Sequence, residues 1–136
     1  MKSNEKYIEI ARYWIVKAKE SLKSAQLEYE QKLLSFAANR LYYAAFYAAS
    51  ALLASRGQSY GKHSAVRASV HRDFVKTGLL SLEQGKLYDK LFFDRQEGGY
   101  VAFTEFDESV IEQQIRKVKD LIDRFEKIFK EEAESP

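Results

Sequence analysis

The chain has 136 residues, of which 22 are basic and 20 acidic, so its net charge is +2. This balance argues against a polybasic nucleic-acid binder but leaves room for a local basic patch. The absence of cysteine excludes disulfide scaffolds, zinc fingers and thiol catalysis. The sequence has no signal-peptide pattern and no apolar run long enough to span a bilayer. We expect a single domain, residues 1–136, in a cytoplasmic protein that makes no membrane contact.

The first predicted helix begins near the N-terminus, where Ser3 or Asn4 can cap it and Glu5 stands in its first turn. Apolar side chains then recur at steps of three and four residues, which is the pattern of a helix with one buried face. These positions are Ile8, Ala11, Ile15, Ala18, Leu22, Ala25 and Tyr29, with Trp14 beside them. We expect this stripe to face the core.

A second helix is predicted over about residues 33–56, and its many alanines let neighbouring helices approach closely. We therefore expect it to be the central helix. Its apolar stripe comprises Ala37, Leu41, Ala44, Ala45, Ala48 and Leu52. Arg40, Tyr43 and Tyr47 lie three and four positions apart, so they form a second stripe of cationic and aromatic side chains.

Two helices follow a loop at residues 57–62. The first is predicted over about residues 63–76 and ends at Thr77-Gly78. The segment from Ser81 to Gln84 matches a capping box, which predicts the start of the next helix. We expect that helix to stop near Gly98-Gly99, because adjacent glycines are poor helix formers.

The last helix is predicted to open with a capping pattern from Thr104 to Asp107. Its apolar residues, at alternating steps of four and three, are Ile111, Ile115, Val118, Ile122, Phe125 and Phe129. This spacing extends over fewer than three heptads, so it favours antiparallel bundle packing over a coiled coil. We expect the acidic tail, residues 130–136, to fray.

These elements predict an all-α fold, an up-and-down antiparallel helical bundle of four long helices plus one shorter helix. Charge is unevenly divided along the chain. Residues 1–68 carry 11 basic and 5 acidic side chains, whereas residues 69–136 carry 11 and 15. The two halves can therefore attract each other within the fold, and the asymmetry need not mark a ligand site.

His63, Arg67 and His71 recur every four residues, so they share one face of the predicted third helix. The two histidines would be about 12 Å apart along the helix, which is too far for one metal ion. We therefore predict no metal site. A cationic face that meets phosphate and an ordinary solvated face both fit the pattern, and the solvated face is the more common.

The segment around Arg95 carries a second candidate, because two glycines and then Tyr100 follow this arginine. A helix break at the glycines can turn the tyrosine back toward the arginine. The guanidinium could then clamp a phosphate through two hydrogen bonds while the tyrosine hydroxyl donates a third. Equally, Arg95 can serve only to cap carbonyl groups at the end of the helix.

Four stretches together resemble the HEPN family, in particular its small stand-alone bacterial and archaeal members. They are residues 39–49, 62–64, 74–80 and 95–100. The resemblance covers most of the chain. It implies an up-and-down helical bundle, a homodimer with a composite RNA cleft, and metal-independent ribonuclease activity with no cofactor. It also implies a minimal nucleotidyltransferase as partner in a toxin–antitoxin pair.

The family motif is an arginine and a histidine with four to six residues between them. Arg95 matches the arginine, and Tyr100 occupies the position of the histidine. The arginine would stabilise a phosphorane-like transition state. Tyrosine, with a pKa near 10, is a poor general base at neutral pH but can act as an acid. His63 is a candidate for the missing imidazole, so Arg95, Tyr100 and His63 are the candidate catalytic residues.

Candidate RNA- or nucleotide-binding residues are Arg95, Arg40, Tyr43, Arg67 and His71. The first hypothesis is a HEPN ribonuclease that binds RNA or a nucleotide at a dimer cleft. The alternative is a catalytically silent dimeric module that binds a nucleotidyltransferase, and the modest net charge favours it slightly. A third reading is a nucleotide-binding accessory domain. The rings of the second helix could reach a dimer partner or pack within the monomer.

Overall fold

The computed structural model describes the backbone of residues 5–100 and 106–134, and the side chains of these residues apart from 96–100. Within these ranges the chain is helical and contains no strand, which confirms the predicted all-α fold. The elements are α1 (Glu5–Glu30), α2 (Leu34–Ser55), α3 (His63–Ser69), its π-helical continuation η1 (Val70–Val75), α4 (Leu82–Tyr100) and α5 (Glu108–Glu134).

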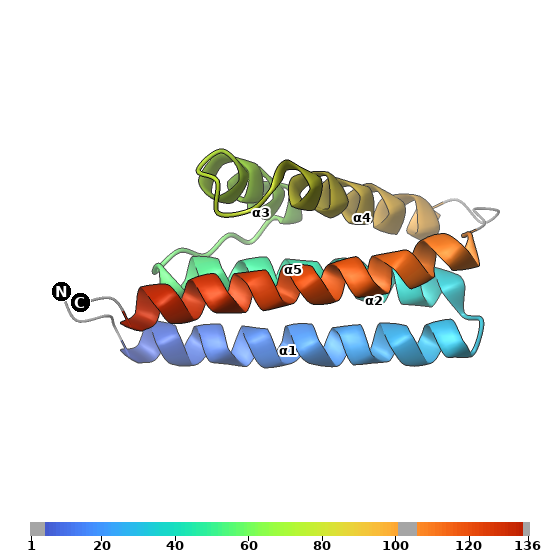
Figure 1. Cartoon of the computed structure of the whole chain (residues 1–136), viewed down its shortest axis with the longest axis horizontal. Coiled ribbons are helices and arrows are strands. Elements are labelled where there is room, and N and C mark those ends of the chain that lie inside the picture. Colours follow the sequence, from blue (N-terminus) through green and yellow to red (C-terminus); the bar gives the residue numbers. More distant parts are fainter. Residues whose placement is uncertain (1–4, 101–105, 135–136) are drawn as a thin grey trace.

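The helices form two layers (Figure 1). The long helices α1, α2 and α5 lie side by side, and α3, η1 and α4 cover them on one side. The start of α1 and the end of α5 lie at the same end of the bundle. Helix α2 contacts α1, α3, α4 and α5, so it is the central helix, as its alanine content predicts.

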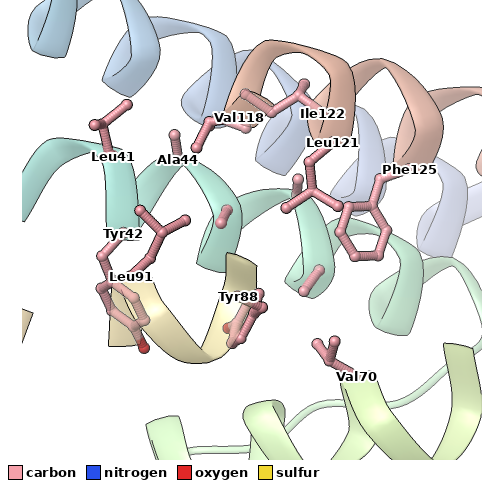
Figure 2. Packing of buried hydrophobic residues seen from close by; sticks show 14 of the residues in the cluster. Leu41, Tyr42, Ala44, Val70, Tyr88, Leu91, Val118, Leu121, Ile122 and Phe125 are labelled. Carbon is pink, nitrogen blue, oxygen red and sulfur yellow. The ribbon is translucent and has the colours of Figure 1, made fainter. Parts of the chain in front are cut away.

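The composition of α2 explains how four helices can pack around it. Small side chains allow helix axes to approach closely because little volume separates the two backbones. Figure 2 shows Ala44 on the side that faces Val118 of α5, whereas Tyr42 points the opposite way, toward Tyr88 and Leu91 of α4. The buried alanines of α2 are Ala37, Ala38, Ala44, Ala45, Ala48, Ala49 and Ala51.

The apolar stripes predicted for the first and last helices are in the core. In α1, the alanines of the stripe and Ile15 are buried, and the larger residues at its edges are partly buried. In α5, all six stripe residues are buried, together with Leu121 and Ile128. The three- and four-residue periodicity therefore identified the buried faces of both helices correctly.

Ion pairs join the basic first half of the chain to the acidic last helix. Lys19 lies 2.9 Å from Glu126, and Arg56 lies 2.7 Å from Glu132. A third pair joins Lys32 to Glu108 near the other end of α5. Some of the oppositely charged residues of the two halves thus pair with each other within the fold. Exposed ion pairs of this kind each contribute only about 0–1 kcal/mol to the free energy of unfolding.

The capping signals agree with the structure where it describes them. The backbone N–H of Ser81 donates to Gln84, and that of Gln84 donates to the Ser81 hydroxyl, both over 3.0 Å. Asp107 accepts from the backbone N–H of Ser109 at the start of α5. The other predicted cap residues, Ser3, Asn4 and Thr104, lie outside the described residues.

Helix α4 ends at Tyr100, one residue past the glycines near which the sequence predicts its end. The helix nevertheless passes through Gly98-Gly99 without a break, because glycine weakens a helix by only about 1 kcal/mol and does not forbid its backbone angles. Helix α5 continues to Glu134, so residues 130–134 of the expected frayed tail are helical. Phe129 is buried there and Glu132 pairs with Arg56, which ties this end to the bundle.

The predicted third helix begins at His63 as expected but changes character at Val70. The backbone N–H of Lys76 donates to the His71 carbonyl over 2.9 Å, the five-residue step of a π-helix. Gly85 of α4 lets η1 approach, since a Cβ at this position would meet Val75 Cγ2 at 2.9 Å. No helix in the described ranges is both long and apolar enough to cross a membrane.

The packing around α2 predicts the effect of enlarging one of its alanines. Ala48 is fully buried, so Ala48→Leu overpacks the core and should destabilise the fold by about 1–3 kcal/mol. Ala68 on α3 is exposed, and Ala68→Leu should change the free energy of unfolding by less than about 0.5 kcal/mol. Urea denaturation measures both; equal effects of the two substitutions would contradict the central position of α2.

Candidate functional site

Three helices meet around the side chain of His63, which is the first residue of α3. Tyr42 and Phe46 are four residues apart and so share a face of α2, and Tyr43 lies next to Tyr42 along the helix. Arg95 comes from α4 and packs on the tyrosine rings of this cluster. We call these five residues the Arg95–His63 cluster.

The His63 ring is held by contacts on several sides. The Phe46 ring stacks on it with centroids 4.3 Å apart and an interplanar angle of 23°. Its Nδ1 atom is 2.8 Å from the Tyr42 hydroxyl, and the Tyr43 ring meets it edge-on at 5.7 Å. The contact to Tyr42 engages Nδ1, so Nε2 is the ring nitrogen left for a ligand.

Burial lowers the pKa of His63, and the positive charge of Arg95 lowers it further. An imidazole ordinarily titrates near 6.5, so His63 is mainly neutral at pH 7. A neutral imidazole can accept or donate a proton, which is the property that general acid–base catalysis requires.

Arg95 is held by aromatic rings in place of a carboxylate. Its Cζ atom lies 4.9 Å from the centre of the Tyr42 ring and 5.9 Å from that of Tyr43. Nη1 donates to the Tyr43 hydroxyl over 3.4 Å, while Nε is buried with no hydrogen-bond partner. No carboxylate among the described side chains lies within ion-pair distance of Arg95. Its charge is therefore available to an anionic ligand.

Tyr42 contacts both functional groups of the cluster and stays neutral itself. Burial raises its pKa to about 12, so its hydroxyl keeps its proton at physiological pH. Its neighbour Tyr88 is buried as well, and burial raises the pKa of that hydroxyl well above the usual range. Tyr42 thus orients His63 and supports Arg95 without acting as a base.

Arg67 and His71 form a second cluster, on the same face of the α3–η1 segment as predicted. Arg67 Nε and His71 Nε2 both lie 2.7 Å from Asp89 Oδ1 of α4. Burial opposes ionisation of Asp89, but the hydrogen bonds from Arg67 and His71 outweigh it and lower the pKa of this carboxyl. Arg67 also lies over the Phe93 ring, 4.8 Å from its centre.

The sequence left open whether the face with Arg67 and His71 meets phosphate or is only solvated, and the structure shows an ion pair with α4 there. Arg67 and His71 are half-buried and share one carboxylate, so they join α3 and η1 to α4. Among the described side chains, no hydrogen bond or ion pair joins Arg67 or His71 to Arg95 or His63. Among the described residues, no group of three or more histidine, aspartate or glutamate side chains is gathered in a way that could hold a metal ion.

The three residues of the cationic and aromatic stripe predicted on α2 contact different parts of the structure. Arg40 faces α1, where its Nε atom is 3.9 Å from Glu28 Oε1 and its side chain is half exposed. Tyr47 stacks on Trp14 of α1 with centroids 5.4 Å apart. Only Tyr43 joins the Arg95–His63 cluster, so the structure does not bring Arg40 to it.

Tyr100 is the last residue of α4, and its side chain lies outside the described residues. The helix is continuous from Arg95 to Tyr100, so the expected break that would turn the tyrosine back is absent. Tyr42 and Phe46 are site residues that the sequence analysis did not single out. Their four-residue spacing around Tyr43 is the signal that could have found them.

Comparison with known proteins agrees with this architecture. The HEPN domain model matches residues 11–130. The chain belongs to the HEPN family. This HEPN protein is 42% identical to a UPF0332 protein of Thermotoga maritima over 131 residues, which is 96% of this chain and 97% of the relative.

Two more distant relatives carry a functional name. Both are proteins of Methanocaldococcus jannaschii named "Putative toxin", and both are 31% identical to this chain. The matches extend over 103 and 114 residues, which is 76% and 84% of this HEPN protein and 70% and 84% of the relatives. The resemblance inferred from the four sequence stretches is thus confirmed at the level of the family.

The geometry predicts how His63 titrates. Its pKa, followed by NMR, should lie below about 6.5 and should rise in Arg95→Gln, because the positive charge nearby is removed. The unfolded chain binds this proton more readily, so His63 should reduce stability as the pH falls below about 6.5. Arg116→Gln on the exposed face of α5 is the control and should leave the titration unchanged. An ordinary pKa in the wild type, or no change in Arg95→Gln, would contradict the cluster.

Proposed function

We propose that this HEPN protein is the toxin-like member of a toxin–antitoxin pair and cleaves RNA without a metal ion at the Arg95–His63 cluster. The observation that carries the proposal is the pairing of an arginine without a carboxylate partner in the described residues with a neutral imidazole. Both contact the ring of Tyr42. Two relatives named as putative toxins support the toxin-like role.

In this proposal Arg95 binds the phosphate that is to be cleaved. Its guanidinium donates to the non-bridging oxygens and stabilises the extra negative charge of the pentacoordinate transition state. The aromatic surroundings strengthen this interaction, because rings replace water around the charge and keep the local dielectric low. Since the rings of Tyr42 and Tyr43 already hold the guanidinium, little conformational entropy is lost when the phosphate binds.

His63 would take the proton from the ribose 2′-hydroxyl through Nε2. The 2′-oxygen then forms a bond to phosphorus while the bond to the 5′-oxygen of the next nucleotide breaks. The leaving oxygen takes a proton from solvent, because the unbroken helix α4 does not turn Tyr100 back toward Arg95, and His63 later releases its proton to solvent. The products are a 2′,3′-cyclic phosphate and a 5′-hydroxyl end, so no water, metal ion or oxidant enters the balance.

We further propose that the active form is a homodimer and that its partner is a minimal nucleotidyltransferase. The family resemblance supports both, and the partly exposed rings of Tyr43, Phe46 and Tyr47 leave aromatic surface beside the site. A partner of this kind could silence the protein by covering the cluster or by transferring a nucleotide to Tyr100.

Sedimentation as a monomer at tens of micromolar would contradict the homodimer. Mass spectrometry that finds Tyr100 unmodified after co-expression with the nucleotidyltransferase would contradict the nucleotide transfer.

A catalytically silent module that only binds a nucleotidyltransferase remains the second candidate. The observation that favours it is Tyr100 at the position where the family motif has a histidine. In this reading Arg95 would contact a carboxylate or a nucleotide phosphate of the partner. The two candidates differ in one respect that can be measured, namely cleavage of RNA by the isolated protein.

The direct experiment is an RNA cleavage assay in the presence of EDTA. The wild type should cleave single-stranded RNA to products with cyclic phosphate ends. Arg95→Ala should lower kcat/KM by about 100- to 1000-fold, and His63→Ala by about 100-fold or more. The acid limb of the pH–rate profile should have an apparent pKa below about 6.5, because the base must be neutral and its pKa is lowered.

The matched control is Arg116→Ala, which removes an exposed arginine of α5 that forms an ion pair with Glu112 on the same helix. This variant should cleave like the wild type. Cleavage that survives Arg95→Ala would point to a contaminating nuclease and refute the proposed site. Absence of cleavage by the wild type would refute the ribonuclease and leave the silent module.

A further inference from the structure

A pocket of about 330 Å³ opens between the first half of α1, the second half of α2 and the loop at residues 57–62. Four aromatic rings line it, from Tyr7, Trp14, Phe46 and Tyr60. Its size is at the lower end of the range for small-molecule sites, about 300–1,000 Å³. The pocket therefore suits one flat ring system better than a larger ligand.

The walls of the pocket are held in place by neighbouring contacts. The Trp14 ring stacks on Tyr47 at a centroid distance of 5.4 Å, which fixes its orientation. Gly57 has a φ of +75° and lies against Tyr7, where a Cβ would come within 2.8 Å of Cε2. Only glycine lets the loop close on Tyr7 in this way. The pocket is thus formed before any ligand arrives.

The chemistry of the lining fits a nucleobase. Bases offer a flat π-face that stacks on aromatic side chains and a polar edge that needs hydrogen-bond partners. The rings supply the stacking surfaces, and the hydroxyl groups of Ser50 and Ser59 with the amide of Gln58 supply polar groups. None of the described residues that line the pocket carries a charge, so this lining does not suit the phosphate itself.

The pocket adjoins the Arg95–His63 cluster through shared residues. Phe46 lines the pocket and also stacks on the His63 ring at 4.3 Å. Val66, one helical turn after His63, lines the pocket as well. The pocket and the Arg95–His63 cluster therefore meet at Phe46, whose ring is common to both.

We propose that this pocket binds one unstacked base of the RNA strand whose phosphate Arg95 holds. The inference rests on the proposed function for the identity of the ligand as RNA. It adds that the protein takes single-stranded RNA, because a base must leave its stack to enter the pocket. A paired duplex offers no such base without melting.

Trp14 provides the first test, because it is the only tryptophan of the chain and lines the pocket. Adenosine 5′-monophosphate should change its fluorescence on titration. Ribose 5-phosphate, which has the sugar and phosphate but no base, should not. Equal effects of the two compounds, or no effect of the nucleotide at millimolar concentration, would overturn the inference.

The second test fills the pocket. Ser50→Phe places a ring where the base would lie and should weaken binding of a six-nucleotide single-stranded RNA by about tenfold or more, the contribution expected of one stacked base. Phe36→Leu is the control, since this exposed ring lies in the first turn of α2, away from the pocket. Circular dichroism checks that both variants fold.

A second variant keeps the test decisive if Ser50→Phe does not fold. Tyr60→Leu removes a ring at the mouth, where the side chain is 36% exposed and truncation leaves the core intact. It should weaken the same RNA and reduce the fluorescence change. If the folded variants bind this RNA as tightly as the wild type does, the inference is overturned. If they bind RNA normally but no longer bind a protein partner, the pocket belongs to that protein partner and not to RNA.

The fluorescence and cleavage experiments together distinguish failure of the base-binding pocket from failure of the proposed ribonuclease. Base-dependent fluorescence changes without any RNA cleavage would support the pocket and refute the nuclease. Cleavage that depends on Arg95, with no base-dependent signal from Trp14, would support the nuclease and overturn the pocket.

Discussion

The contact of Arg95 with the rings of Tyr42 and Tyr43 is the interaction on which the proposed site depends. It holds a guanidinium in a half-buried position with no carboxylate partner among the described side chains. Cation–π contacts of this kind contribute about 0.5–2 kcal/mol each. A carboxylate would hold the arginine more firmly but would also neutralise it. The rings keep the charge in place and leave it for a ligand, and the same charge helps to keep His63 neutral.

Helix α2 makes the Arg95–His63 cluster possible because its different faces contact different helices. Its alanines admit α1 and α5 at close range and form the centre of the core. Tyr42, Tyr43 and Phe46 face α3 and α4, where they contact the side chains of His63 and Arg95. Within the second layer, Asp89 of α4 pairs with Arg67 of α3 and His71 of η1 and so joins these elements to one another. The site is therefore built on rigid helices, and the position of each functional group depends on packing.

Sequence patterns predicted the fold well and the site only in part. Periodicity located the buried faces of α1, α2 and α5, and the capping box at Ser81 located the start of α4, because these features follow from local geometry. The expected break between Arg95 and Tyr100 is wrong, because two glycines destabilise a helix too little to interrupt it. The pairing of Asp89 with Arg67 and His71 could not be predicted, because a contact between residues far apart in the chain leaves no local sequence pattern. Likewise, only the packing of α3 on α2 brings His63 into the cluster with Arg95.

The most direct test of the central claim is a double-mutant cycle on RNA cleavage, with Arg95→Ala, His63→Ala and both together. Two groups that act on one phosphate as a unit are strongly coupled. We therefore predict that the double variant loses far less than the product of the two single losses. Single losses that simply multiply would show that Arg95 and His63 act independently and would contradict a shared site.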